Sequence, residues 1–269
     1  MTIIATDLDR TLFPNGDQEY DGSMDRFSRL VDESGFHLVY VTGRNKRQII
    51  EGMEQFSAPP PEYAVAEVGT KVYLFSEGSL DEDPGYIEYI ESKTGIWDIE
   101  KFKESLRWVE EIRLQEEEHQ NRFKLSYYVD PGQSEKAVEE VHSRLQALSA
   151  DFNLIYSVDE TKNLGLLDVL PTHANKLEGL EYVRQKLGAD KEDVVFCGDS
   201  GNDIIPLTSG YKAVLVRNAL DEVREQVEEE AKRQGIRDRI YFARGTDSLN
   251  GYYVSGVIEG LEHFGFGEA

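Results

Sequence analysis

Short apolar runs alternate along this chain with segments in which apolar residues recur every three or four positions. The runs are rich in β-branched residues and each ends at a turn signal, as strands do. They predict strands at residues 2–6, 36–41, 193–198 and 212–217. The helical spacing predicts helices near residues 24–31, 49–56 and 220–231. This alternation predicts an α/β fold, a doubly wound parallel sheet covered by helices on both faces.

The pattern changes in the middle of the chain. Two longer helical stripes run from Ile99 to Ile112 and from Val138 to Leu148, and residues 123–130 and 152–159 alternate with the period of two that strands show. We therefore predict an α+β cap domain at residues 82–163, inserted into a core formed by 1–81 and 164–269. Residues 76–85 are expected to form the outgoing linker, and the apolar run at 164–171 a strand of the core.

Charge and composition narrow the functional class. The chain of 269 residues has 29 Lys and Arg against 52 Asp and Glu, a net charge of -23, which repels nucleic acid and anionic lipid. No apolar stretch approaches the length of a membrane span, and no basic segment followed by an apolar core opens the chain. The single cysteine, Cys197, lies in an apolar run and is expected to be buried. We expect a cytoplasmic protein with no nucleic-acid or membrane partner.

Four acids follow two of the predicted strands. Asp7 and Asp9 project to the same side after the first strand, and Asp199 and Asp203 follow the run at 193–198. A turn with helix-capping acids is an alternative explanation for Asp7 and Asp9 when that pair is considered alone. Together, at the sheet edge where α/β proteins bind ligands, such oxygen ligands suit a hard cation such as Mg²⁺, although ligand type alone leaves Ca²⁺ open.

Two further segments supply groups that can bind phosphate. Thr42 and Gly43 follow the strand at 36–41, where a hydroxyl and backbone N–H groups at a helix N-terminus can hold phosphoryl oxygens. Lys176 lies near the start of another predicted helix and can neutralise a phosphate. Considered alone, the first feature is better explained as an ordinary turn and the second as a solvated lysine, but the order of all four segments and their placement at strand ends favour a phosphate site.

The segments DLDRT, TGR, Lys176 and GDSGND, in this order, resemble the haloacid dehalogenase superfamily of aspartate-dependent phosphatases. The insertion resembles the αβ cap of the branch that contains sugar-phosphate phosphatases. Within that branch, the segments GDSGND, VRNA, SYYVD and EGLEHFGF are most similar to the sucrose-phosphate phosphatase family, with mannosylfructose-phosphate phosphatases as close relatives. One departure is Leu177, where related enzymes often have glycine. Lys162 and Lys186 are therefore alternatives, but Lys176 opens a helix after an apolar run.

The resemblance implies a reaction and a role for each of these residues. Asp7 would attack phosphorus and form an aspartyl-phosphate, while Asp9 would protonate the departing sugar oxygen and later activate water. Thr42 and Lys176 would hold the phosphoryl oxygens. Mg²⁺ would be bound by Asp7, the backbone carbonyl of Asp9, and Asp199, and Asp203 would orient Lys176 or a metal-bound water.

The resemblance also implies that the substrate is a small-molecule sugar phosphate, with sucrose 6-phosphate favoured. Mannosylfructose phosphate and other sugar phosphates remain alternatives, as does a non-catalytic sugar-phosphate-binding partner of a synthase, whose expected mark is the loss of a catalytic acid. We expect a monomer that can associate with a sugar-phosphate synthase. Polar residues near the expected cleft are substrate-binding candidates, although each also has an ordinary surface or packing explanation: Gly43, Arg44, Gln48, Glu67, Thr70, Lys124, Tyr127 and Asn202.

Overall fold

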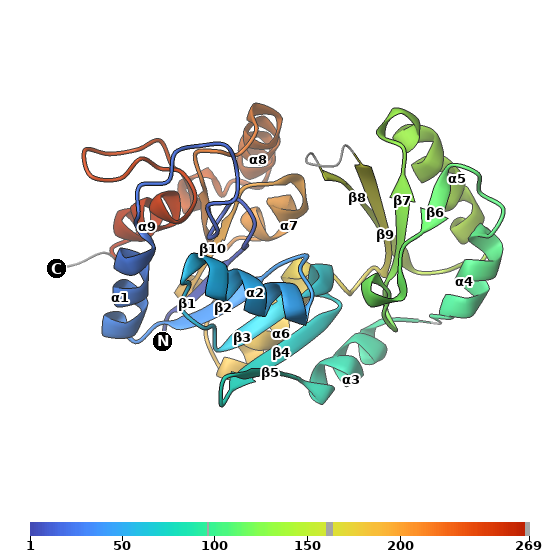
Figure 1. Cartoon of the computed structure of the whole chain (residues 1–269), viewed down its shortest axis with the longest axis horizontal. Coiled ribbons are helices and arrows are strands. Elements are labelled where there is room, and N and C mark those ends of the chain that lie inside the picture. The colour runs from blue at the N-terminus through green and yellow to red at the C-terminus, as the bar shows by residue number, and fades with distance from the viewer. Residues whose placement is uncertain (96, 160–163, 267–269) are drawn as a thin grey trace. The chain divides into compact units, whose positions relative to one another are not determined.

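The computed structural model describes residues 1–95, 97–159 and 164–266 (Figure 1). The chain divides into two compact units, one of Met1–Asp83 with Lys176–Ala269 and the other of Pro84–Asn175. The first unit corresponds to the predicted core and the second to the predicted insertion. The outgoing boundary falls within two residues of the prediction, whereas the chain returns to the core at residue 176 and not at residue 164.

The core is built on one eight-stranded sheet in the order β12-β11-β10-β1-β2-β3-β4-β5. The strands from β12 to β3 are parallel, and β4 and β5 are antiparallel additions at one edge. The predicted strands are confirmed, and their continuous burial matches a sheet covered on both faces. The strand bounds are β1 Ile3–Thr6, β2 His37–Val41, β3 Tyr63–Ala66, β4 Lys71–Ser76, β5 Ser79–Glu82, β10 Val194–Gly198, β11 Lys212–Leu215 and β12 Ile240–Phe242.

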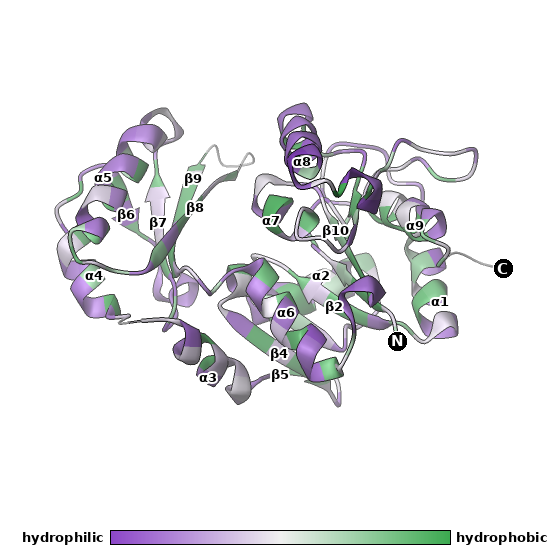
Figure 2. Ribbon diagram, turned by 180° about the vertical axis from the view of Figure 1, so that it is seen from behind, coloured by the Kyte–Doolittle hydropathy of each residue, from purple (hydrophilic) through white to green (hydrophobic). Residues whose placement is uncertain are grey.

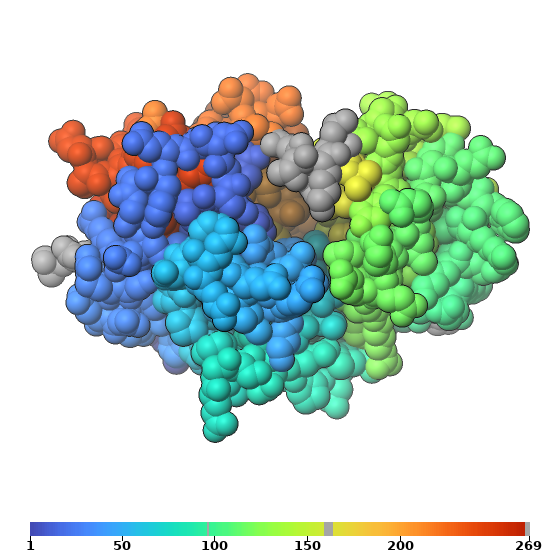
Figure 3. Space-filling view, in the orientation of Figure 1, coloured from blue at the N-terminus to red at the C-terminus, as the bar shows by residue number. Residues whose placement is uncertain are grey.

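Helices cover both faces of this sheet, so the doubly wound prediction is confirmed (Figures 1 and 2). On one face α9 packs on β11 and on α1; on the other, α6 packs on β2 and β3, and α7 on β10 and β11. The N-terminal segment through α2, in blue, forms much of the core surface visible in Figure 3. The helix bounds are α1 Met24–Ser34, α2 Lys46–Phe56, α6 Lys176–Leu187, α7 Ile204–Leu207, α8 Asp221–Gln234 and α9 Val254–His263. Among the described residues, no helix is long and apolar enough to cross a membrane.

The segment predicted as the outgoing linker is largely a β-hairpin. Strands β4 and β5 are antiparallel, and Tyr73 pairs with Glu82 at one end and Ser76 with Ser79 at the other. The turn between the strands has positive φ at Glu77 (50°) and Gly78 (80°). Two consecutive residues with positive φ form the turn that matches the twist of paired strands. The polar sequence of this segment therefore reflects an edge hairpin of the core.

The second unit is an antiparallel four-stranded sheet in the order β6-β7-β9-β8 with helices packed on it, which confirms the α+β class. The core of this unit contains Phe102, Leu106, Val141 and Leu145 from two helices, together with Leu167 from the sheet. The element bounds are α3 Pro84–Lys93, α4 Ile99–Leu106, β6 Ile112–Leu114, β7 Leu125–Val129, α5 Ser134–Gln146, β8 Phe152–Asp159 and β9 Leu164–Pro171.

Two predictions for this region were wrong. The helix expected to reach Ile112 ends at Leu106, because Ile112 pairs with Val129 as an edge strand. The run Leu164–Pro171, assigned to the core, is β9 and pairs with β7 and β8 on its two sides. Apolar runs of this length suit a central strand of either sheet, so periodicity alone did not decide between them.

Candidate active site

The site lies where neighbouring parallel strands of the core end together. Strands β2, β1 and β10 are adjacent and end at Val41, Thr6 and Gly198. The backbone N–H of Asp7 still donates to the carbonyl of Cys197, at 2.9 Å, so the first acid leaves the sheet directly beside β10. The segments that follow these strands therefore meet at one edge, as the sequence predicted.

Lys176 joins the segments after β1 and β10. Its ammonium donates to Asp7 Oδ1 at 2.8 Å, to Asp203 Oδ1 at 2.7 Å and to Asn202 Oδ1 at 2.8 Å. The lysine is 2% exposed. Burial acts to lower its pKa, but the charges of Asp203 and Asp7 outweigh burial and raise the pKa, so the ammonium stays charged. Of the alternative lysines, Lys186 binds Asp83 further along α6, and Lys162 lies outside the described residues.

Three carboxylates gather around this lysine. One oxygen from each of Asp7, Asp199 and Asp203 lies within 4.8 Å of the others, and all three residues are buried. Burial raises the pKa of Asp7 well above its ordinary value, and burial with the charge of Asp203 raises the pKa of Asp199 to about 7. Such crowding of hard oxygen ligands fits a divalent cation like Mg²⁺, whose charge would relieve the repulsion.

The loop after β10 is shaped to hold Asp203 against the end of the strand. Asp203 Oδ2 accepts the backbone N–H groups of Asp199 and Ser200, each at 3.2 Å. A Cβ added at Gly198 would lie 2.7 Å from Cβ and Cγ of Asp203, so this close approach requires glycine. The Gly-Asp sequence at 198–199 is thus a packing requirement as well as a source of ligands.

Two neighbours of Asp199 were not predicted from the sequence. Thr11 Oγ1 donates to Asp199 Oδ1 at 3.0 Å, and Arg10 Nε lies 3.6 Å from Asp199 Oδ2. Arg10 has a positive φ of 60°, and its carbonyl accepts the side-chain amide of Asn218 at 2.6 Å. Both residues belong to the DLDRT segment, so the motif could have indicated them, whereas no sequence signal pointed to Asn218.

The turn after β2 lies against a second turn after β3. Thr42 is buried and its Oγ1 accepts the backbone N–H of Arg44 at 3.1 Å. The N–H of Val68 donates to the carbonyl of Thr42 at 3.1 Å, and the N–H of Glu67 donates to the carbonyl of Arg44 at 3.0 Å. Glu67 and Val68 both have positive φ, an unusual conformation for such side chains that these backbone bonds help to hold.

Asp9 lies beside the three-carboxylate cluster and is not one of its members among the described residues. Its carboxylate accepts both Nε and Nη2 of Arg44. Partial burial acts to raise the pKa of Asp9, but the hydrogen bonds and charge of Arg44 outweigh burial and lower it. In this structure Arg44, a substrate-binding candidate, is thus bound to Asp9.

The other substrate-binding candidates are dispersed. Gln48 caps α2 through reciprocal bonds with Asn45, and Asn202 accepts Lys176. Gly43 is exposed at the turn after β2.

Two candidates form bonds within the turn after β3, where Glu67 pairs with Lys71 at 3.3 Å and Thr70 Oγ1 donates to the carbonyl of Glu67 at 2.8 Å. The remaining two candidates, Lys124 and Tyr127, belong to the second unit and are buried. The ring of Tyr127 packs in the apolar core of that unit.

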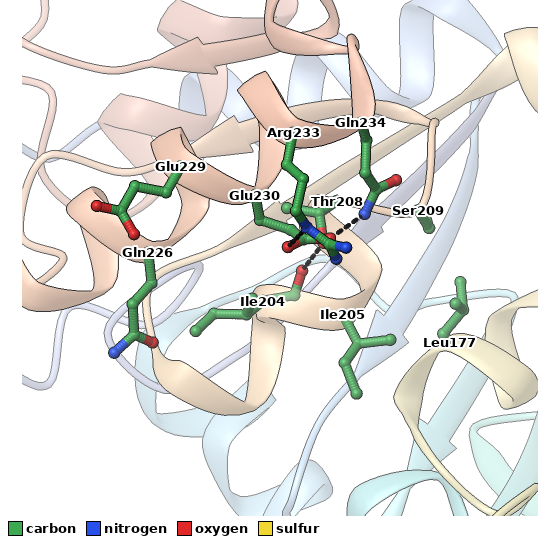
Figure 4. Close-up of a pocket in the computed structure, with 10 residues that line it drawn as sticks. All are labelled: Leu177, Ile204, Ile205, Thr208, Ser209, Gln226, Glu229, Glu230, Arg233 and Gln234. Atoms are coloured by element: carbon green, nitrogen blue, oxygen red, sulfur yellow. Dashed lines mark hydrogen bonds and ion pairs between the residues drawn. The ribbon is translucent and has the colours of Figure 1, made fainter.

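A groove of about 710 Å³ borders the site on the core (Figure 4). Its apolar residues include Leu177, which follows Lys176, and Ile204, which follows Asp203. None of the four acids lines it, and the opposite wall is the polar side of α8, mostly purple in Figure 2. The groove is therefore separate from the carboxylate cluster.

Comparison with known proteins agrees with the geometry. Residues 1–265 match the family described as sucrose-6F-phosphate phosphohydrolase. A HAD-like hydrolase of Nitrosococcus oceani is 39% identical over 97% of this chain and 71% of its own length. Sucrose-phosphatase 1 of Nicotiana tabacum is 28% identical over 98% of this chain but 59% of its own length. Mannosylfructose-phosphate phosphatase of Agrobacterium fabrum is 26% identical over 98% and 97%.

The fold has a close counterpart among solved structures. The sucrose-phosphatase of Synechocystis sp. PCC6803, solved with sucrose and phosphate, superposes with a TM-score of 0.77 at 24% identity, over 98% of each chain. At that identity the likeness supports the fold. The family match over nearly the whole chain supplies the assignment: this chain belongs to the sucrose-6F-phosphate phosphohydrolase family of haloacid dehalogenase-like phosphoric monoester hydrolases.

Proposed function

We propose that this chain is a Mg²⁺-dependent phosphatase that hydrolyses a disaccharide phosphate, with sucrose 6-phosphate as the favoured substrate. The observation that carries the proposal is the buried contact of Asp7 with Lys176 inside a cluster of carboxylates. A carboxylate that is to attack a phosphate dianion needs positive charge beside it, and Lys176 supplies that charge at 2.8 Å. The names of the relatives indicate a sugar phosphate.

In this mechanism Asp7 attacks phosphorus, and the bond from phosphorus to the sugar oxygen breaks. Asp9, which must take up a proton against the charge of Arg44 before this step, gives that proton to the oxygen, which leaves as the sugar hydroxyl, while Asp7 carries the phosphoryl group. Asp9 then accepts a proton from the water that hydrolyses the aspartyl-phosphate, so that inorganic phosphate departs and both aspartates return to their starting states. Thr42 and Lys176 hold the phosphoryl oxygens in line.

Asp203 serves this mechanism by fixing Lys176. Its Oδ1 accepts the ammonium at 2.7 Å, and its other oxygen is held by the backbone of the same loop. Asp7, Asp199 and the backbone carbonyl of Asp9 would bind Mg²⁺, which would supply further positive charge to the phosphoryl oxygens.

Sugar recognition is assigned to the polar residues predicted from the sequence, except Arg44, which is bound to Asp9, with Lys124 the candidate from the second unit. Lys124 is 6% exposed, and a lysine so enclosed is normally paired with a polar group. The Agrobacterium fabrum relative supports mannosylfructose phosphate as the second candidate substrate. All four acids are present, which argues against the non-catalytic alternative. The cytoplasmic location, the monomeric state and an association with a synthase remain predictions.

Phosphate release tests the proposal directly. Wild type, Asp7→Asn and the matched control Asp25→Asn, an exposed acid of α1, are assayed with and without Mg²⁺. The panel contains sucrose 6-phosphate, mannosylfructose phosphate, trehalose 6-phosphate, glucose 6-phosphate and fructose 6-phosphate. We expect Mg²⁺-dependent turnover, fastest on sucrose 6-phosphate and absent only in Asp7→Asn. Preference for another sugar phosphate would change the substrate, and no turnover on any of them would remove the enzymatic proposal.

A further inference from the structure

Two parallel hydrogen bonds hold the carboxylate of Asp9. Arg44 Nε donates to Asp9 Oδ2 at 2.8 Å, and Arg44 Nη2 donates to Asp9 Oδ1 at 2.7 Å. The amide of Asn15 donates to Asp9 Oδ1 at 2.6 Å. Both oxygens are therefore bonded within the core. A paired contact between a guanidinium and a carboxylate fixes orientation as well as distance.

The guanidinium of Arg44 is itself held in a fitted site. Its Nη1 donates to the carbonyl of Gln48 at 2.9 Å, and its Cζ lies 5.0 Å from the centre of the Phe13 ring. A Cβ added at Gly52 on α2 would lie 2.6 Å from Arg44 Nη1 and 2.4 Å from Cε2 of Phe13. Glycine at this helical position thus leaves the space that the arginine and the ring occupy.

We propose that Arg44 is a positioning residue for Asp9, so that it affects turnover by orienting this carboxylate and not by contacting the substrate. The inference rests on the proposed function, in which Asp9 protonates the departing sugar oxygen. It replaces our sequence-based expectation that Arg44 binds the substrate. Its consequence is specific to the first step: formation of the aspartyl-phosphate should depend on Arg44 where the leaving group needs a proton, and little where the leaving group is stable as an anion.

Two esters separate these cases. The leaving group of sucrose 6-phosphate is a sugar alkoxide that needs a proton, whereas the leaving group of p-nitrophenyl phosphate is p-nitrophenolate, a stable anion. For Arg44→Met we expect kcat/KM, which reports formation of the aspartyl-phosphate, to fall about tenfold to a hundredfold on sucrose 6-phosphate, with a much smaller change on p-nitrophenyl phosphate. Gly52→Ala, which crowds Arg44 without removing it, should give a smaller loss of the same kind. If Arg44→Met fails to fold, Gly52→Ala carries the test.

Arg47→Met is the matched control. Arg47 lies in the first turn of α2, which begins two residues after Arg44; its side chain is 69% exposed, and its partner Glu51 is 3.7 Å away. This variant should match wild type on both esters. A loss on sucrose 6-phosphate equal to that of Arg44→Met would mean that the loss follows from removing any positive charge near the start of α2, and would overturn the inference.

A double-mutant cycle with Asp9→Asn decides whether Arg44 acts through Asp9. We expect Arg44→Met to cause no further loss of kcat/KM on sucrose 6-phosphate once Asp9 is replaced. Losses that multiply would show an independent role and overturn the inference while leaving the proposed phosphatase intact. A wild type that turns over neither ester would overturn both.

Discussion

Replacing Asp199 by asparagine should stabilise the metal-free protein while it removes a proposed Mg²⁺ ligand. Asp199 is 4% exposed, and burial with the charge of Asp203 raises its pKa from 3.8 to about 7. Since one pKa unit corresponds to about 1.4 kcal/mol, a shift of roughly three units makes the charged carboxylate cost about 4 kcal/mol of folding free energy. Asparagine keeps the shape, and its side-chain oxygen can still accept Thr11.

The stability that Asp199→Asn gains over wild type should increase with pH. Below about pH 4, Asp199 is protonated in both the folded and the unfolded chain, so its replacement changes little. As the pH rises from about 4 to about 7, the unfolded chain releases this proton and the folded chain retains it. The free energy of unfolding of the wild type therefore falls across this window, and above pH 7 the full difference remains.

Urea unfolding in EDTA at pH 5 and at pH 8 measures this difference for wild type, Asp199→Asn and the exposed control Asp25→Asn. We expect Asp199→Asn to be more stable than wild type, with most of the gain at pH 8, and the control to match wild type at both. Added Mg²⁺ should stabilise wild type but not Asp199→Asn. A variant that is no more stable than wild type at pH 8 would refute the argument, because it would mean that Arg10 and Thr11 fully compensate the buried charge.

Three further predictions concern the core. Gly198→Ala should lose about 1–3 kcal/mol in thermal unfolding and most of its phosphatase activity, because the added methyl would lie 2.7 Å from Asp203; unchanged rates would show that the loop can shift freely. Gly78→Ala should cost about 1 kcal/mol at a φ of 80° in the β4–β5 turn, with kcat unaffected, since the turn holds no site residue. Cys197 is buried as predicted and burial raises the pKa of its thiol, so a thiol reagent should modify it only as the chain unfolds, and rapid labelling of the native protein would contradict this.

Local pattern was sufficient for most of the core. The apolar runs that became β1, β2, β10 and β11 are buried on both faces, and such strands are visible as continuous apolar segments. Parallel strands end at a common edge, so the order of elements also predicted that Asp7 and Asp203 would meet. Their contacts with Lys176 agree with that reasoning.

The local sequence pattern predicted the wrong element or the wrong sheet where the same residues suited two arrangements. The run Leu164–Pro171 has the apolar content of a core strand, but its partners are β7 and β8. Ile112 continues a helical stripe in the sequence, but it pairs with Val129 and forms part of an edge strand. In both cases the deciding energy comes from pairing with other strands, which the apolar content of a single run does not reveal.

The sequence by itself determined which chemical groups the site would contain, because strand ends and residue types are local properties. The tertiary structure decided which of those groups bind one another. Arg44 follows Asp9 by 35 residues, and their pairing depends on the space left at Gly52 and on the adjacent ends of β1 and β2. Hydrogen bonds and charge interactions act only over a few ångströms, so the partner of each carboxylate was fixed when packing brought these segments together.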